Sequence, residues 1–313
     1  MKKQQKFLVI VDQSYFLYYI IYGATAEFGR KFPQLAQHWI KPAEEVDQQN
    51  LPDLTACQEF TRTLRKFVMK RLETIDWLTK QHFQQELDMS DRIDILFADD
   101  DYVSNSLRKK LYPAYKAQRK ISKKSYDVFK IRNYITNIVF KDLDIYKDYN
   151  FLRVDGAEGD DVIACILKNF KDEYETIVLF ASDHDFLQID GVHQLDLFGK
   201  EAKRQVAGID VTADEYLLTK ILIGDGADNI GKVFSGVGPK KALKLVRDKD
   251  SLKAKLKESQ DAAKQYLLNK KLISFKEIPK ELEEKIVKEA HEKLFKNDVL
   301  NAESTDLASF MTL

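Results

Sequence analysis

The chain has 313 residues, 44% of them hydrophobic, and its 50 Lys and Arg balance its 50 Asp and Glu. This length and apolar content exclude a small disulfide-stapled module and a largely disordered chain, and they suit one large domain or two ordinary ones. A net charge of zero excludes a uniformly basic nucleic-acid coat but is compatible with opposed acidic and basic patches. Cys57 and Cys165 lie far apart in apolar contexts, which indicates no disulfide framework or zinc site and favours a reducing interior.

The first 26 residues have some features of a secretory signal. Three lysines precede an apolar stretch, and residues 24–26 read Ala-Thr-Ala, which is similar to a cleavage site. However, the polar residues 12–14 divide the apolar stretch, and the remaining piece at 15–22 is rich in Tyr and far too short to span a bilayer. We therefore expect no signal peptide, no transmembrane segment and no membrane contact, which predicts a cytoplasmic protein.

The N-terminal third predicts two buried strands separated by helices. Residues 7–11 form a short continuous apolar run that ends at an aspartate, which is typical of a buried parallel strand. A helical stretch follows, and then a loop punctuated by three prolines between residues 33 and 52. Residues 55–87 have the amphipathic pattern of a long helix, and residues 93–98 read as a second buried strand.

The remaining two thirds continue this alternation and then become helical. Helical patterning extends to about residue 140, Gly156 opens another helix, and residues 176–180 form a third strand. From about residue 213 the chain reads as helical, with a Gly-rich turn at 236–239. Strands that alternate with helices predict an α/β fold with a mostly parallel central sheet flanked by helices. In such sheets, ligands bind beyond the carboxyl ends of the strands.

Acidic residues recur where the predicted strands end, in the helix that Gly156 opens, and in the Gly-rich loop at 224–229. The candidates are Asp12, Asp99, Asp100, Asp101, Glu158, Asp160, Asp161, Asp183, Asp185, Asp225 and Asp228. If the sheet gathers even half of them, like-charge repulsion requires protons or hard cations. An all-oxygen set without nearby His or Cys favours Mg²⁺ or Mn²⁺ over Zn²⁺, and two such ions can clamp a phosphodiester during its displacement.

Each acidic group also has an ordinary structural interpretation. The acids at 158–161 lie in the first turn of a predicted helix, where carboxylates favour the macrodipole. Asp183 and Asp185 follow a strand, and Asp225 and Asp228 lie in a Gly-rich loop, so all four suit turns or caps. These interpretations do not explain why aspartates recur at the ends of three separate strands.

Residues 102–126 form a basic segment without any acid. They contain eight Lys and Arg residues, interleaved with four tyrosines. A charge run usually marks a solvated helix face, but this one directly follows an acidic strand end. Aromatic rings can stack on unpaired bases while Lys and Arg bind phosphates. The segment therefore favours a nucleic-acid contact.

Seven motifs in order carry a family resemblance from Asp12 to about Val246. They are VDQS at 11–14, an Asp-rich strand end at 97–101, R-x7-K-x2-R at Arg108, Lys116 and Arg119, EGDD at 158–161, SDHD at 182–185, GDGADN at 224–229 and GVGPKKA at 236–242. This order resembles the flap endonuclease or 5′-nuclease family, and most resembles its phage ribonuclease H branch. The resemblance implies a metal-dependent exonuclease and flap endonuclease that acts at 5′ ends, including RNA primers, in DNA replication or repair.

The resemblance also implies the metal ligands. Asp12, Asp100, Glu158, Asp160 and Asp161 match the first of two metal sites, and Asp183, Asp185, Asp225 and Asp228 match the second. One position stays open, because spacing from the basic motif selects Asp100 whereas the strand end selects Asp99. We favour Asp100. The implied cofactors are two Mg²⁺ ions, for which Mn²⁺ can substitute.

In the family, the basic segment forms an arch through which the 5′ strand passes. The resemblance places Lys116 and Arg119 at the scissile phosphate, and it assigns Arg108 to the same catalytic group. Residues that would contact DNA in the arch are Tyr115, Lys120, Lys123 and Lys124.

The Gly-rich turn is similar to the hairpin with which the family grips duplex DNA. Backbone N–H groups near Gly236 and Gly238 would face a phosphate, with Lys240 and Lys241 beside it. The resemblance implies a monovalent cation, K⁺, at this element. The chain departs from the family at residues 23–54, where it carries extra sequence, and at 229–236, before the Gly-rich turn.

These observations predict a three-part chain. Residues 1–212 would form the α/β nuclease core with an arch at about 102–135, residues 213–303 a helical DNA-binding region with a helix-hairpin-helix-like element at 236–242, and residues 304–313 a flexible tail. The expected partners are branched or nicked duplex DNA and RNA–DNA hybrids with 5′ ends, bound by a monomer in a bacterial or phage-infected cell. Replication proteins, either a single-strand-binding protein or a sliding clamp, are further expected partners. The clamp-like peptide at 194–198 reads instead as a buried strand.

Two other function classes remain open from the sequence. A structure-specific DNA-binding protein without catalysis would need to have lost ligands, and none is missing. A small single-strand ribonuclease of the PIN type would lack the arch and the Gly-rich hairpin.

Overall fold

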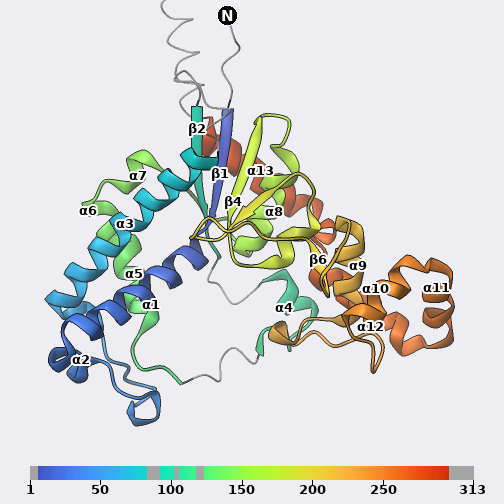
Figure 1. Cartoon of the computed structure of the whole chain (residues 1–313), viewed down its shortest axis with the longest axis horizontal. Helices are drawn as coiled ribbons and strands as arrows, with labels where there is room; N and C mark the ends of the chain where they lie inside the picture. The colour runs from blue at the N-terminus through green and yellow to red at the C-terminus, as the bar shows by residue number, and fades with distance from the viewer. Residues whose placement is uncertain (1–5, 83–91, 102–105, 118–122, 296–313) are drawn as a thin grey trace, which may run out of the picture.

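A five-stranded parallel sheet forms the centre of the protein (Figure 1). The computed structural model describes residues 6–82, 92–101, 106–117 and 123–295. The strands are β1 (Lys6–Asp12), β2 (Arg92–Ala98), β3 (Asn150–Leu152), β4 (Thr176–Phe180) and β5 (His193–Leu195). They lie in the order β3-β2-β1-β4-β5, and every neighbouring pair is parallel. The predicted α/β class with a mostly parallel sheet is confirmed.

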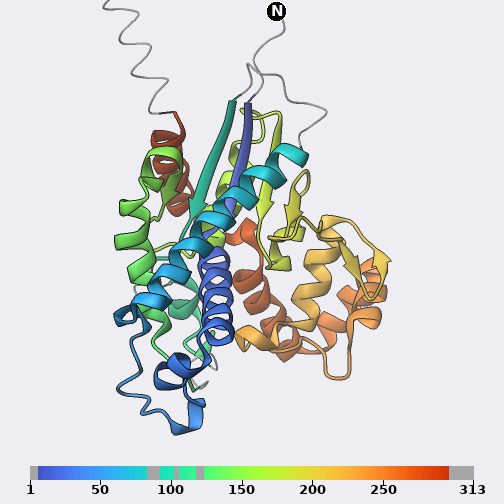
Figure 2. The ribbon, with the colours of Figure 1, turned by 60° about the vertical axis from the view of Figure 1, so that its left-hand side comes forward.

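Helices cover both faces of the sheet (Figures 1 and 2). Side chains of β1 alternate between the faces: Phe7, Val9 and Val11 pack in one core, and Leu8 and Ile10 in the other. The first core lies against α1 (Gln13–Lys31), α3 (Gln58–His82) and α5 (Val128–Tyr134), and the second against α8 (Gly159–Asn169) and α13 (Lys280–Leu294). Because both faces are covered, the continuous apolar run of β1 is fully buried.

Shorter elements connect these layers. They are α2 (Pro33–Trp39), η1 (Ala43–Glu45), η2 (Leu54–Ala56), α4 (Leu107–Leu111), the π-helical stretch η4 (Ile135–Val139), α6 (Phe140–Asp142), α7 (Ile145–Asp148), η5 (His184–Gln188) and the hairpin of β6 (Gln205–Val206) and β7 (Ile209–Asp210). The proline-punctuated loop was predicted from Pro33 onward, but α2 begins there. The prediction was wrong at this point because proline at the first helical position has no N–H to lose and a φ that suits a helix.

The predicted strands at 7–11, 93–98 and 176–180 are confirmed by β1, β2 and β4. The long helix predicted over 55–87 corresponds to α3, and residues 83–87 lie outside the described part of the chain. The short strand β3 was not predicted. Across the described ranges, no helix is both long and apolar enough to cross a bilayer.

From Ala213 onward the described chain is helical. Besides α13, which packs on the sheet, the helices are α9 (Ala213–Ile223), η6 (Gly226–Asp228), α10 (Pro239–Arg247), α11 (Lys249–Glu258), α12 (Gln260–Ile273) and η7 (Phe275–Glu277). They gather beside the carboxyl ends of the sheet strands (Figure 1). Two small cores hold them together, with Leu217 and Ile221 of α9 in one core and Leu222 of α9 in the other.

Gly224 ends α9 in a conformation that requires glycine. Its φ is 69°, and a Cβ atom there would lie 2.4 Å from the carbonyl oxygens of Ile230 and Gly231. The backbone N–H of Asp225 donates to Ile230, and that of Ile230 donates back to Asp225. This close turn fixes the loop that carries Asp225 and Asp228 against the end of the helix.

Candidate functional site

The carboxyl ends of β1, β2 and β4 place three predicted ligands at one edge of the sheet. In register, Asp12 of β1 lies beside Ala98 of β2, and Val11 lies beside Phe180 of β4. Asp100 follows β2 by two residues, and Asp183 follows β4 by three. The sheet therefore brings together acids that are far apart in the sequence.

Asp12 carries a charge that the fold does not fully stabilise. It caps α1 by accepting a hydrogen bond from the Tyr15 N–H at 3.0 Å. Burial, together with the charges of Asp100 and Asp183, raises the pKa of Asp12 to about 7 despite that bond. A cation at this edge would favour the ionised form.

The structure separates the roles of Asp99 and Asp100. Asp99 is buried, pairs with Arg132 and accepts a hydrogen bond from Gln13 Nε2 at 3.0 Å, so protein groups occupy its carboxylate. Burial raises the pKa of Asp99 to about 6 although Arg132 opposes the shift. Asp100 instead accepts from Ser14 Oγ at 2.8 Å and from the Gly159 N–H at 2.7 Å. The printed partners of Asp100 are thus neutral donors, whereas Asp99 pairs with a charged arginine.

The N-terminus of α8 adds acids to the same edge. Glu158 is the N-cap, and Asp160 lies in the first turn. Burial raises the pKa of Asp160 well above its usual value, and Asp183, Asp12 and Asp100 raise it further although Lys116 opposes them. Gly159 allows this approach, because a Cβ there would lie 3.2 Å from Asp100 Oδ1.

Lys116 reaches into the acidic site from the basic segment. Its Nζ lies 2.8 Å from Glu158 Oε2, and its backbone N–H donates to the Asp228 carbonyl at 3.0 Å. Burial favours neutral Glu158, but Lys116 and Arg108 outweigh it and hold the pKa of Glu158 below its usual value. Burial likewise opposes the charge of Lys116, yet Glu158 raises its pKa above the ordinary range, so the amine stays charged.

Arg108 and Asp161 form a buried ion pair behind the site. The guanidinium donates to both Asp161 oxygens, at 2.9 and 2.7 Å, and its Nε donates to the Leu272 carbonyl at 2.8 Å. Both residues are buried. Arg108 was predicted to be catalytic and Asp161 to bind metal, but their charged atoms are engaged with each other. They connect α4, α8 and α12.

The second acidic group surrounds a lysine that sequence reasoning missed. Lys220 of α9 forms an ion pair with Asp185, and its Nζ lies 3.3 Å from Asp225 Oδ2. Asp183 caps η5 by accepting from the Asp185 N–H at 2.8 Å. A lysine in the last turn of a helix ordinarily serves the macrodipole, so its position gave no signal of this role.

Acids of both groups line one small cavity. Its volume is about 10 Å³, close to the space that one water molecule needs, and its lining includes Asp160 from the first group and Asp185, Asp225 and Asp228 from the second. No three His, Cys, Asp or Glu side chains of the described residues are already arranged as a metal cage. The two groups therefore face a common space without closing around one point.

The basic segment differs in detail from the expectation. Tyr115, predicted to contact DNA, is 4% exposed and packs with Leu217 and Ile221, so its ring is covered by protein. Its hydroxyl lies 3.3 Å from Glu158 Oε2. Lys123 is exposed, whereas Arg119 and Lys120 lie outside the described residues.

The extra sequence at 23–54 contacts the C-terminal end of the basic segment and the residue that follows it. Gln48 Nε2 donates to the Lys124 carbonyl at 2.9 Å, and the Lys124 N–H donates back to Gln48 Oε1 at 2.7 Å. The Asp127 N–H donates to the Pro52 carbonyl at 3.0 Å. Through these bonds the extra sequence fixes the point at which the basic segment rejoins the core.

The Gly-rich turn precedes α10, which begins at Pro239. Gly236 has a φ of 70°, and Gly238 is the N-cap. Lys240 and Lys241 are exposed on the first turn of α10, where no ion pair engages them among the described residues. Their charges are available to an anionic partner.

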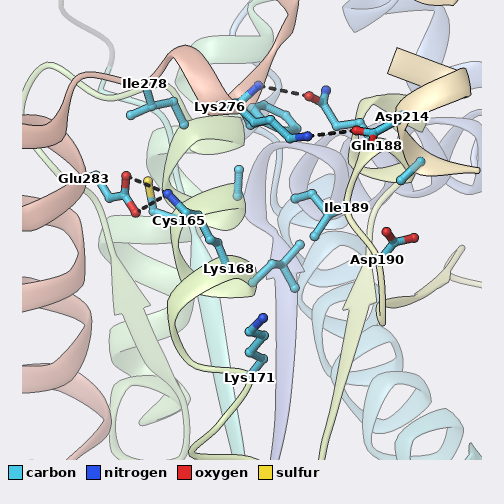
Figure 3. Close-up of a pocket in the computed structure, with 14 residues that line it drawn as sticks. Cys165, Lys168, Lys171, Gln188, Ile189, Asp190, Asp214, Lys276, Ile278 and Glu283 are labelled. Carbon is cyan, nitrogen blue, oxygen red and sulfur yellow. Dashed lines mark hydrogen bonds and ion pairs between the residues drawn. The ribbon is translucent and has the colours of Figure 1, made fainter. Parts of the chain in front are cut away.

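A second cavity lies between α8, α9 and η7 (Figure 3). It has a volume of about 320 Å³, and its lining includes the buried Cys165. Its charges largely cancel, because Lys168 pairs with Glu283 and Lys276 with Asp214. None of the predicted site residues lines it.

A match to a protein-family model assigns this chain to a family. Residues 54–214, slightly more than half of the chain, match the model of the 5′-3′ exonuclease N-terminal resolvase-like domain. The chain belongs to this 5′-3′ exonuclease family. The resemblance inferred from the ordered motifs is confirmed.

Curated relatives of the 5′-3′ exonuclease family agree with this assignment. A 5′-3′ exonuclease of Mycoplasmopsis pulmonis is 29% identical over 202 residues, which cover 57% of this chain and 64% of that protein. A 5′-3′ exonuclease of Aquifex aeolicus is 28% identical, over 50% of this chain and 53% of its own length. The ribonuclease H of Enterobacteria phage T4 is 33% identical over 95 residues, 30% of this chain and 31% of that protein. The chain thus spans less than two thirds of these relatives.

Solved structures of two T5 nucleases share the fold. The T5 5′-exonuclease with bound zinc has a TM-score of 0.58 at 16% identity and covers 92% of this chain and 99% of its own. The T5 D15 flap endonuclease in a complex with DNA and metal ions has a TM-score of 0.56 at 14% identity, with the same coverage. At this identity the likeness concerns the fold.

Arg108→Met should destabilise the protein by about 3–5 kcal/mol, because it leaves the buried Asp161 carboxylate without a counter-ion. Lys110→Met removes an exposed charge from the same helix and should change stability by less than about 0.5 kcal/mol. Urea unfolding in the presence of a chelator measures both variants. Equal stability of the two variants would show that the buried pair does not hold α4 to α8.

Proposed function

We propose that this chain is a structure-specific 5′-nuclease that hydrolyses phosphodiesters with divalent metal ions. The observation that supports it most is that acids of both groups line one cavity, while Lys116 pairs with Glu158 of the first group. Membership of the 5′-3′ exonuclease family supports the same activity. The proposed reactions are 5′→3′ exonuclease cleavage, flap cleavage and removal of RNA primers.

The acidic site fits hard divalent ions. Its donors are carboxylate oxygens, and the raised pKa of Asp12 shows negative charge that a cation would stabilise. We assign Asp12, Asp100, Glu158 and Asp160 to one Mg²⁺ and Asp183, Asp185, Asp225 and Asp228 to a second, with Mn²⁺ able to replace either. When bound, the two ions would stabilise charge on the attacking and leaving oxygens of the phosphodiester.

Lys116 would act on the reacting phosphate directly. Its ammonium is held at the acidic edge by Glu158, where it stays charged. A fixed cation there can stabilise the charge that develops on the phosphate during displacement. We assign Arg119 to the same task. Arg108 and Asp161 would instead position α4 and α8 for it.

The substrates would be branched or nicked duplex DNA and RNA–DNA hybrids with 5′ ends. The hairpin before α10 would grip the duplex backbone through Lys240 and Lys241, with a K⁺ ion at the Gly-rich turn. Lys120, Lys123 and Lys124 would contact the 5′ strand. A single-strand-binding protein or a sliding clamp would be the replication partner of the monomer.

A non-catalytic DNA-binding protein is the alternative that an assay must separate. Purified protein should cut 5′-flap, nicked and RNA-primed duplexes only when Mg²⁺ or Mn²⁺ is added. Asp100→Asn should slow cleavage by on the order of 10²-fold or more while duplex binding persists. Asp101→Asn is the matched control, because Asp101 accepts a structural hydrogen bond from the Gly156 N–H at 2.8 Å. Metal-independent binding without any cleavage would favour the alternative.

Lys116→Ala should lower the single-turnover cleavage rate much more than duplex affinity, since its proposed partner is the reacting phosphate. Lys110→Ala, on the exposed face of α4, should leave the rate close to that of the wild type. Rates at saturating enzyme and binding isotherms separate the two effects. A loss of affinity alone would make Lys116 a binding residue.

Replacement of Lys240 and Lys241 by Ala should make the slope of log affinity against log salt concentration less negative by roughly one to two, because fewer counter-ions are released. The loss should be similar for all duplex sequences, since phosphate contacts carry no sequence information. The control is replacement of the exposed Lys66 and Lys70 of α3 by Ala, which removes two positive charges at a distance from the hairpin in the sequence. An equal salt dependence in the two double variants would reject the hairpin as the duplex grip.

A further inference from the structure

Lys220 is a mostly buried cation inside the second acidic group. Its side chain is 16% exposed, forms an ion pair with Asp185 and lies 3.3 Å from Asp225 Oδ2. The two carboxylates come from different parts of the chain, one after β4 and one after α9. Lys220 therefore bridges two of the four acids assigned to the second metal ion.

The position of this ammonium group is fixed by packing. The next residue, Ile221, is buried in one small core, and Leu222 is buried in the other. Gly224 ends the helix in a turn that admits only glycine. Because residues of α9 next to Lys220 are buried in two different cores, rotation of the helix that moved the Lys220 side chain away from the acids would disturb both cores.

A favourable interaction with the helix macrodipole does not account for this geometry. That effect requires only a cation near the last turn, and an exposed lysine would provide it. Here the amine is largely removed from water and directed at two carboxylates. Such burial costs free energy unless the charge is paired. The pairing with Asp185 and Asp225 is thus the reason that Lys220 is tolerated at this place.

We propose that Lys220 is a positioning residue that acts as a tethered counter-ion of the second metal site. It holds Asp185 and Asp225 together in the metal-free chain, and it shares these carboxylates with the divalent ion. The net negative charge of the four acids is then smaller by one, so Lys220 weakens the affinity of that site for a divalent ion. This inference rests on the proposed function, because it assumes that these acids bind divalent ions.

Lys220→Met, which keeps the length and apolar stem of the side chain, tests the proposal without measuring cleavage. Calorimetric titration with Mn²⁺ should show one class of sites tightened by roughly 10-fold, within the range typical of coupling between two bound species. In chelator, the same variant should unfold at a lower temperature than the wild type. Lys276→Met, which removes an exposed ion pair with Asp214, should change neither property.

Several outcomes separate this inference from the proposed function. If the wild type binds Mn²⁺ and Lys220→Met binds it with equal or weaker affinity, the counter-ion role is overturned and the nuclease proposal stands. If the wild type binds no Mn²⁺, the metal site itself is rejected. Should Lys220→Met not fold, Lys220→Gln keeps a polar side chain at the position and must show the same tightening for the proposal to hold.

Discussion

Several carboxylates approach one another at one edge of the sheet, and their mutual repulsion governs how the site is built. Three parallel strands end at the same edge of the sheet, where Asp12 ends β1 and Asp100 and Asp183 follow β2 and β4. The fold answers this repulsion in part with its own cations: Arg108, Lys116, Arg132 and Lys220 each pair with an acid of the site. At Asp12, burial and the charges of Asp100 and Asp183 still raise the pKa to about 7.

The internal cations divide the acids by role. Asp99 and Asp161 have their oxygens engaged by arginines and connect structural elements. Asp12 and Asp100 instead accept hydrogen bonds from neutral donors, and burial disfavours ionisation of Asp12 and Asp160, which a hard divalent ion bound to these oxygens would offset. Lys116 and Lys220 have a different role, because each pairs with a proposed metal ligand. Lys116 reaches the site from the basic segment and Lys220 from α9. In the proposed nuclease, protein cations support the shape of the site and divalent ions would complete its charge.

Much of this arrangement could be predicted from the sequence, and the rest depended on tertiary contacts. The apolar runs at 7–11, 93–98 and 176–180 are followed by aspartates, and parallel strands bring such ends together. The α/β fold and the acidic edge of its sheet could therefore be predicted from the sequence. The pairing of Arg108 with Asp161 was not, because 53 residues separate them and either is plausible at an exposed position. Tyr115 looked like a stacking residue beside lysines, but the hydrophobic side chains that cover it come from α9 and α12. Lys220 gave only the pattern of an ordinary helix end.

The dependence of unfolding on Mg²⁺ tests this account most directly. If the acidic edge is a divalent-ion site, thermal stability should rise with the logarithm of Mg²⁺ concentration once that concentration exceeds the dissociation constant, because the ions bind only the folded chain. The comparison is made at constant ionic strength, and Asp12→Asn combined with Asp183→Asn should remove most of the dependence. A wild-type unfolding temperature that does not change with Mg²⁺ would contradict the account.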